Sequence, residues 1–170
     1  MDVRRRLRFP NPVNELVART VAAGVLLQAL AFLVTRWPLF LVTLAVGFVL
    51  RVLAGPRWSP LALLASRVIV PRLPFAPKMV PGPPKRFAQG IGATVTTAAV
   101  VAWVADAHWL SFALVGLIVV AATLESVFAI CIGCRVFAGL MRIGIIPASV
   151  CADCADISTR VRERAAAGGS

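Results

Sequence analysis

All four cysteines of the chain lie between residues 131 and 154, as two pairs with two residues inside each pair. The pairs are Cys131–Cys134 and Cys151–Cys154, and 16 residues separate them. Four thiolates at this spacing are a typical zinc-binding set, and they less often hold an iron–sulfur cluster. Such pairs are equally the usual unit of thiol–disulfide or sulfur-transfer relays. Small buried thiols without chemistry are the third alternative, and the spacing alone leaves all three open.

The composition indicates that lipid is the solvent for much of the chain. The 170 residues are 59% hydrophobic and 15% charged, and the mean hydropathy is +0.87. A soluble domain is roughly 45–50% apolar and about 25% charged. The net charge of +11 comes from basic residues that flank apolar runs, as the positive-inside rule expects. No recognition motif accompanies this charge, so we do not expect nucleic-acid binding.

The apolar runs predict an all-α membrane protein with a four-transmembrane-helix bundle, as a single domain over residues 1–170. A helix needs about 20 mostly apolar residues to cross a bilayer. The predicted spans are 16–34, 39–54, 87–104 and 110–130.

Basic residues also predict the orientation of the chain. Of the 18 Lys and Arg residues, Arg36 alone lies in the first or third turn. We therefore expect both termini on the cytoplasmic side of the plasma (inner) membrane, facing anionic headgroups. The segment 1–8 resembles a signal-peptide start, but the following apolar run is too long, so we expect a retained first helix.

The second loop, 55–86, and the tail, 143–170, are both predicted to be cytoplasmic. Residues 61–70 are too few to cross as a helix, which predicts an interfacial or re-entrant helix that begins at Ser59 and Pro60. The six prolines in 71–84 predict mostly extended chain.

The tail is predicted to form a C-terminal helix. Cys151 and Cys154 would share a face near its start, where a helix N-terminus lowers a thiol pKa.

Arg19, Arg51 and Glu125 fall inside the predicted spans, and the last two stand out because a charge in a membrane interior usually faces a partner. Arg51 lies about 18 Å and Glu125 about 22 Å from the outer face of the bilayer, at 1.5 Å per residue. We predict that they approach each other or share a polar network in the inner leaflet. A buried locking pair, an Arg51 that reaches the headgroups alone, and a carboxylate that relays protons beside the cysteines are the alternatives.

The position of the first cysteine pair follows from the fourth span. If that helix continues through Cys134, both sulfurs lie on one face at the headgroup level. A hinge after Arg142 would then bring the two pairs together. A standing disulfide is not expected on a reducing cytoplasmic side, and His108 is predicted at the opposite end of the bundle, so it cannot join the cysteines.

Several motifs together resemble one family. They occur in order at residues 9–20 (FPNPVNELVART), 55–60 (GPRWSP), 83–89 (PPKRFAQ), 131–134 (CIGC) and 146–154 (IPASVCADC). Together they resemble the bacterial integral-membrane domain-of-unknown-function 4395 family, in an actinobacterial version. The resemblance implies a small multi-span membrane protein without an established activity, and it suggests a thioredoxin-like or sulfurtransferase partner.

The function hypothesis is a membrane protein that takes part in thiol–disulfide or sulfur handling at the cytoplasmic face. Cys131 and Cys134 would be the primary pair, and Cys151 and Cys154 the resolving or relay pair. The alternative is a non-catalytic scaffold or assembly subunit in which all four cysteines hold structural zinc. A small-solute channel or transporter is a weaker alternative, and both enzymatic activity and oligomeric state stay open.

Overall fold

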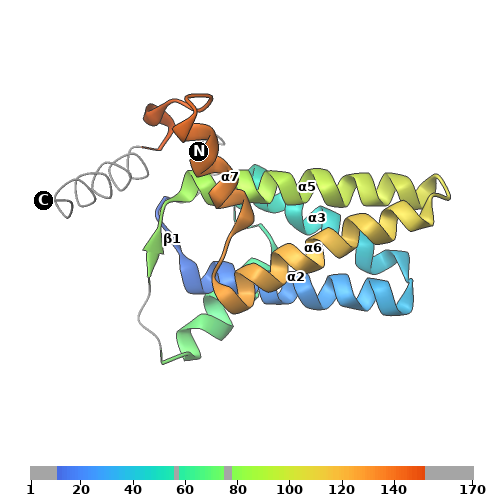
Figure 1. The fold of residues 1–170 in the computed structure, drawn as a ribbon. Coiled ribbons are helices and arrows are strands. Elements are labelled where there is room, and N and C mark those ends of the chain that lie inside the picture. The colour runs from blue at the N-terminus through green and yellow to red at the C-terminus, as the bar shows by residue number, and fades with distance from the viewer. Residues whose placement is uncertain (1–10, 56–57, 75–77, 152–170) are drawn as a thin grey trace, which may run out of the picture.

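The computed structural model describes residues 11–55, 58–74 and 78–151, and the chain over these residues is mostly helical. Four long helices run alongside one another in Figure 1. They are α2 (Glu15–Thr35), α3 (Pro38–Ala54), α5 (Gly82–Val104) and α6 (His108–Phe128). The shorter α7 (Ile132–Arg142) lies against α5 at one end of the bundle. The predicted helices are confirmed, and their bounds differ from the predicted spans by a few residues.

The four long helices close into a ring. Helix α2 packs on α3 and α6, and α5 packs on the same two helices. The core between them is apolar and includes Ala29, Phe32, Leu44 and Val115, all with 0% exposure. Their outer faces are apolar as well, since Val34 is 81% and Val104 is 77% exposed. A helix that is hydrophobic on all sides is typical of a membrane span.

Among the described residues, three helices are long and apolar enough to cross a membrane. These are α2, α5 and α6, whereas α3 is a shorter apolar helix of 17 residues. The finding is consistent with a membrane protein. The structure also begins α5 at Gly82, five residues before the predicted span, because Pro83 and Pro84 lie in the first turn of the helix. Proline fits there, since the first turn needs no intrahelical N–H.

The second loop differs in part from the prediction. A short helix, α4 (Pro60–Leu64), begins with Ser59 at its N-cap as expected. It continues into a π-helical turn (Ala65–Ile69) and a 3-10 turn (Val70–Arg72). The extended segment expected over 71–84 is therefore shorter than predicted and contains β2 (Met79–Val80). In the tail, residues Ala148–Val150 form a 3-10 turn. The predicted helix of the tail would begin at Pro147 or Ser149. As far as residue 151 the structure has the 3-10 turn there, and the rest of the predicted helix lies outside the described residues.

A two-stranded ribbon joins the starts of α2 and α5. Strand β1 (Val13–Asn14) pairs antiparallel with β2, so that Val13 lies opposite Val80. The side chain of Asn14 accepts a hydrogen bond from the N–H of Leu16 at 2.9 Å and caps α2. The side chain of Asn11 accepts one from the N–H of Gly82 at 2.9 Å. These contacts hold the first turn of α5 beside the first turn of α2.

The close packing of α3 on α5 depends on Gly92. A Cβ at this position would overlap the ring of Phe48, whereas a Cβ at Gly90 on the same helix would meet nothing within 4 Å. We predict that Gly92→Ala destabilises the bundle by about 1–3 kcal/mol, because overpacking forces side chains out of place. Gly90→Ala is the matched control and should be neutral or stabilising, since alanine favours a helix. Thermal unfolding in detergent measures both, and equal melting temperatures would contradict this account of the α3–α5 contact.

Candidate functional site

Helix α6 ends before the first cysteine pair and does not continue through it. Ala129 adopts a left-handed conformation with φ 56°, and the N–H of Ile130 bonds to the carbonyl of Leu124 at 2.9 Å. The chain turns here, and Cys131 becomes the N-cap of α7 in an extended conformation. The condition that the fourth helix continues through Cys134 is therefore not met. The physical reason is a left-handed cap formed by alanine, for which the sequence carries no glycine signal.

Glycine permits α7 to lie directly on α5. A Cβ at Gly133 would come within 2.5 Å of the Cβ of Ala88 and 2.6 Å of its Cα. Phe137 is buried one turn later and stacks near Phe87 with ring centroids 5.6 Å apart. The two helices therefore touch along a short seam, and this seam fixes the position of the cysteines over the start of α5.

Cys131 and Cys134 are both free thiols and lie in contact. Cys131 is 9% exposed and Cys134 is half-buried. A hydrogen bond from the Cys134 thiol lowers the pKa of Cys131, although burial acts in the opposite direction. Lys85 and the backbone amide of Cys134 also lower it. The same hydrogen bond and burial raise the pKa of Cys134. The pair therefore contains one activated thiol and one that keeps its proton.

A buried ion pair lies beside the two thiols. The Nζ of Lys85 on α5 is 2.6 Å from Oε1 of Glu125 on α6, and the side chains are 11% and 17% exposed. Both groups act electrostatically on Cys131 and on Cys134. Lys85 was not among the predicted site residues, because the apolar pattern places it in the loop before the third span. Because α5 begins at Gly82, Lys85 lies in the first turn of this helix and its side chain reaches Glu125.

Arg51 and Glu125 belong to one polar network but form no ion pair with each other in the described part of the chain. The Nε of Arg51 donates to Oε1 of Gln89 at 2.9 Å, and its Nη1 donates to Oγ of Ser59 at 3.3 Å. Gln89 is one helical turn from Lys85, which holds Glu125. The prediction was that the two residues approach each other or share a polar network. The described residues show no direct pair, because Glu125 is bonded to Lys85, but the charge of Glu125 still acts on Arg51.

Arg19 has a structural role that sequence reasoning missed. Its Nε and Nη2 donate to the carbonyl of Ser126 at 3.2 and 3.1 Å, and Nη2 also donates to the carbonyl of Val127 at 3.1 Å. These carbonyls lie in the last turn of α6, where backbone oxygens lack intrahelical partners. A guanidinium group at this end also complements the helix dipole. Arg19 therefore ties α2 to the point where the chain turns toward Cys131.

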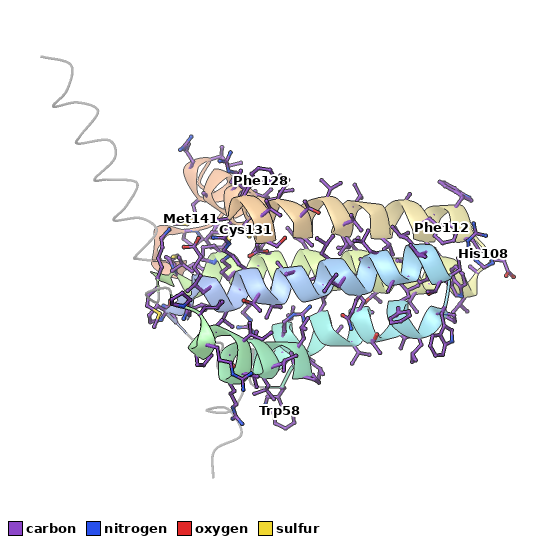
Figure 2. The ribbon with its side chains drawn as sticks, turned by 90° about the horizontal axis from the view of Figure 1, so that it is seen from below. Trp58, His108, Phe112, Phe128, Cys131 and Met141 are labelled. Atoms are coloured by element: carbon purple, nitrogen blue, oxygen red, sulfur yellow. The ribbon has the colours of Figure 1, made fainter. Side chains whose placement is uncertain are left out.

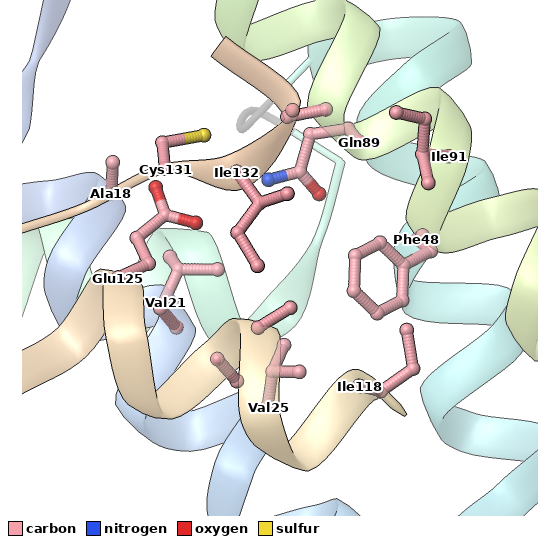
Figure 3. A pocket seen from close by; sticks show the side chains of 16 residues that line it. Ala18, Val21, Val25, Phe48, Gln89, Ile91, Ile118, Glu125, Cys131 and Ile132 are labelled. Carbon is pink, nitrogen blue, oxygen red and sulfur yellow. The ribbon is translucent and has the colours of Figure 1, made fainter. Parts of the chain in front are cut away.

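Cys131 lines two hollows. An open cleft of about 390 Å³ is lined by both cysteines and by Glu15, Lys78, Lys85 and Arg135. An inner cavity of about 120 Å³ extends from Cys131 into the bundle. Figure 3 shows Glu125 and Cys131 side by side at one end of this cavity, with Gln89 pointing into it and Phe48 on the far side. Cys131, although mostly buried, thus borders the cleft and lies beside the Glu125 carboxylate.

The second pair is described only in part. Cys151 is buried and disulfide-bonded, while Cys154 lies outside the described residues. This differs from the expectation of reduced thiols, which followed from the predicted cytoplasmic position. A disulfide sulfur is not a thiolate ligand. Over residues 11–55, 58–74 and 78–151, no group of three or more His, Cys, Asp or Glu residues could hold a metal ion. The four-cysteine zinc site stays a prediction.

The remaining candidate, His108, lies far from the cysteines. Figure 2 shows it at one end of the bundle and Cys131 near the other. Its ring packs on Trp103 with centroids 4.4 Å apart.

The fold and the site together define a helical bundle of membrane type that carries a reduced cysteine pair beside a buried ion pair. Residues 13–142 match the family described as "Domain of unknown function (DUF4395)", and the chain belongs to this family. Cys131 and Cys134 lie within the matched residues, and Cys151 and Cys154 lie beyond them. No curated protein and no solved structure gives a significant match.

The seam between α5 and α7 can be tested through Gly133. We predict that Gly133→Ala forces α7 away from Ala88 and shifts the alkylation rate of Cys131, because the thiol moves relative to Lys85. Gly139→Ala on the same helix is the matched control, since a Cβ there would meet nothing within 4 Å. Alkylation rates at neutral pH, measured in a background without Cys151 and Cys154, check this. Unchanged rates in both variants would show that the seam does not position the thiol.

Proposed function

We propose that this protein is an integral membrane protein whose Cys131–Cys134 pair performs thiol–disulfide exchange with a partner protein. The observation that carries the proposal is the unequal pair, in which Cys131 is activated by a hydrogen bond from its neighbour and opens onto a cleft. A lowered thiol pKa is typical of reactive cysteines, whereas structural thiols in apolar surroundings have raised values. A disulfide or persulfide of a thioredoxin-like or sulfurtransferase protein is the proposed substrate class.

The exchange takes place in two balanced steps. The Cys131 thiolate attacks one sulfur of the partner disulfide, so that a mixed disulfide forms and the second partner sulfur leaves as a thiolate. Cys134 then loses its proton and attacks the sulfur of Cys131. This breaks the mixed disulfide, forms the Cys131–Cys134 disulfide and passes two electrons to the partner. The resolving role thus falls to Cys134, and Cys151 and Cys154 keep a relay role in this proposal.

Glu125 is the proposed acceptor of the Cys134 proton. It lies beside Cys131 in Figure 3, acts electrostatically on Cys134 and is held by Lys85. When Cys131 enters a mixed disulfide, its negative charge disappears, and proton loss from Cys134 becomes easier. A carboxylate beside it provides the general base that the second step requires.

We further propose that α3 is a fourth span, that α4 lies at the interface, and that both ends of the chain face the cytoplasm. The antiparallel ring of four helices supports this, because α3 covers α5 as fully as α6 does. The charge distribution supports the orientation, since the described basic residues cluster at the cysteine end and Arg36 lies at the other end.

The pH dependence of alkylation tests the activation of Cys131. An ordinary thiol has a pKa near 8.5, and only the thiolate reacts. In a background without Cys151 and Cys154, we expect Cys131 to react at a lower pH than this value. Cys134→Ala removes the main cause of the lowered pKa and should shift the profile to higher pH. A profile that does not move would contradict the proposed activation.

Metal analysis together with thiol counting separates the exchange proposal from the zinc scaffold. Exchange predicts a reversible two-electron oxidation of Cys131 and Cys134 in metal-free protein. One tightly held zinc ion, with no thiol titratable until it is chelated, would instead support the scaffold.

The role of Glu125 can be isolated with an aromatic disulfide that releases a coloured thiolate at each step. Glu125→Gln should leave the first release nearly unchanged and slow the second by about a hundredfold, the usual size of general-base catalysis. Glu15→Gln, at the rim of the same cleft, is the control. The double variant Glu125→Gln with Lys85→Met avoids an unpaired buried lysine, and fast second release in it would refute the assignment.

A further inference from the structure

One cation at the cysteine end of the bundle is buried without an ion-pair partner among the described residues. Arg51 is 4% exposed, and over residues 11–55, 58–74 and 78–151 it forms no salt bridge. Glu125 is paired with Lys85 instead. An arginine side chain stays protonated at neutral pH. An unpaired charge in such a position is strongly unfavourable.

The hydrogen bonds of Arg51 also leave one nitrogen without a partner. Its Nε and Nη1 bond to neutral oxygens of Gln89 and Ser59. The face of its guanidinium lies 4.5 Å from the centroid of Phe48. The Nη2 atom is buried and has no hydrogen-bond acceptor within the described residues. A buried donor in this state carries the full cost of its lost hydration.

A small cavity adjoins the same side chain. Its volume is about 40 Å³, and its polar lining consists of Arg51, Lys85 and Gln89. The rest of the wall is apolar: Val13, Val17, Ala18, Val21 and Ala62. A site for one water molecule needs roughly 10–15 Å³ by the same kind of measure. The cavity thus has room for one monatomic ion together with a water molecule, between two cationic side chains and an amide.

We propose that this cavity binds one small monovalent anion of the halide class, with chloride as its representative. The anion accepts the hydrogen bond of Arg51 Nη2 and lies within the field of Lys85. Its negative charge compensates the buried guanidinium of Arg51. The proposal does not depend on thiol exchange, because it rests on Arg51 and its cavity and not on the cysteines.

Melting temperatures of the full chain in nonionic detergent test the proposal, with sodium salts compared at equal ionic strength. Chloride and bromide should raise the melting temperature in a saturable way, whereas gluconate, which is too large for the cavity, should not. Arg51→Met should abolish this rise. Arg36→Met, at the opposite end of the bundle, is the matched control and should keep it. A rise of equal size with every salt, or none with chloride, would overturn the proposal.

A second measurement covers the case in which Arg51→Met fails to fold. Crystals of the unmodified chain soaked in bromide should show an anomalous peak within hydrogen-bond distance of Arg51 Nη2. Excess chloride in the soak should reduce this peak. A bromide-soaked crystal without density at this position would overturn the proposal whatever the variants do.

Discussion

The ion pair between Lys85 and Glu125 is the interaction on which the site depends. It joins the first turn of α5 to the last turn of α6 in a poorly hydrated part of the bundle. Removing one partner of such a pair leaves a buried charge, which costs several kcal/mol. The ribbon, the Asn11 contact and the proline-rich start of α5 all place Lys85 at this point. The surroundings of the thiols are therefore determined by contacts that contain no sulfur.

Two further contacts bring the cysteines to this ion pair. Arg19 holds the last carbonyls of α6, so that the chain turns at a fixed place. Gly133 then lets α7 rest on Ala88 without a gap. The result is a thiol at a helix N-terminus beside a lysine, an arrangement that favours the thiolate. A thiol at a helix N-terminus was expected at Cys151 and Cys154, but the structure shows it at Cys131.

The long helices could be predicted from the sequence because their signal is local. Each apolar run exceeds the length of an ordinary core helix, and the predicted spans lie within the observed helices except at the end of α6. The residue types of the site could be predicted from the sequence, but their arrangement could not. Ala129 ends α6 in a conformation that glycine usually adopts, and Lys85 follows two prolines that also occur in loops. In both places the packing of distant segments decided the local structure.

The order of the elements along the chain has a consequence for biosynthesis. The residues of the long helices that line the inner cavity with Cys131, such as Ala18, Ala88 and Glu125, precede it in the sequence. Translation runs from the N-terminus, and earlier segments fold or insert first. Within residues 1–170 no cysteine precedes these helices. The four thiols are therefore made after the helices that enclose the first of them, which limits wrong pairing with cysteines of other chains.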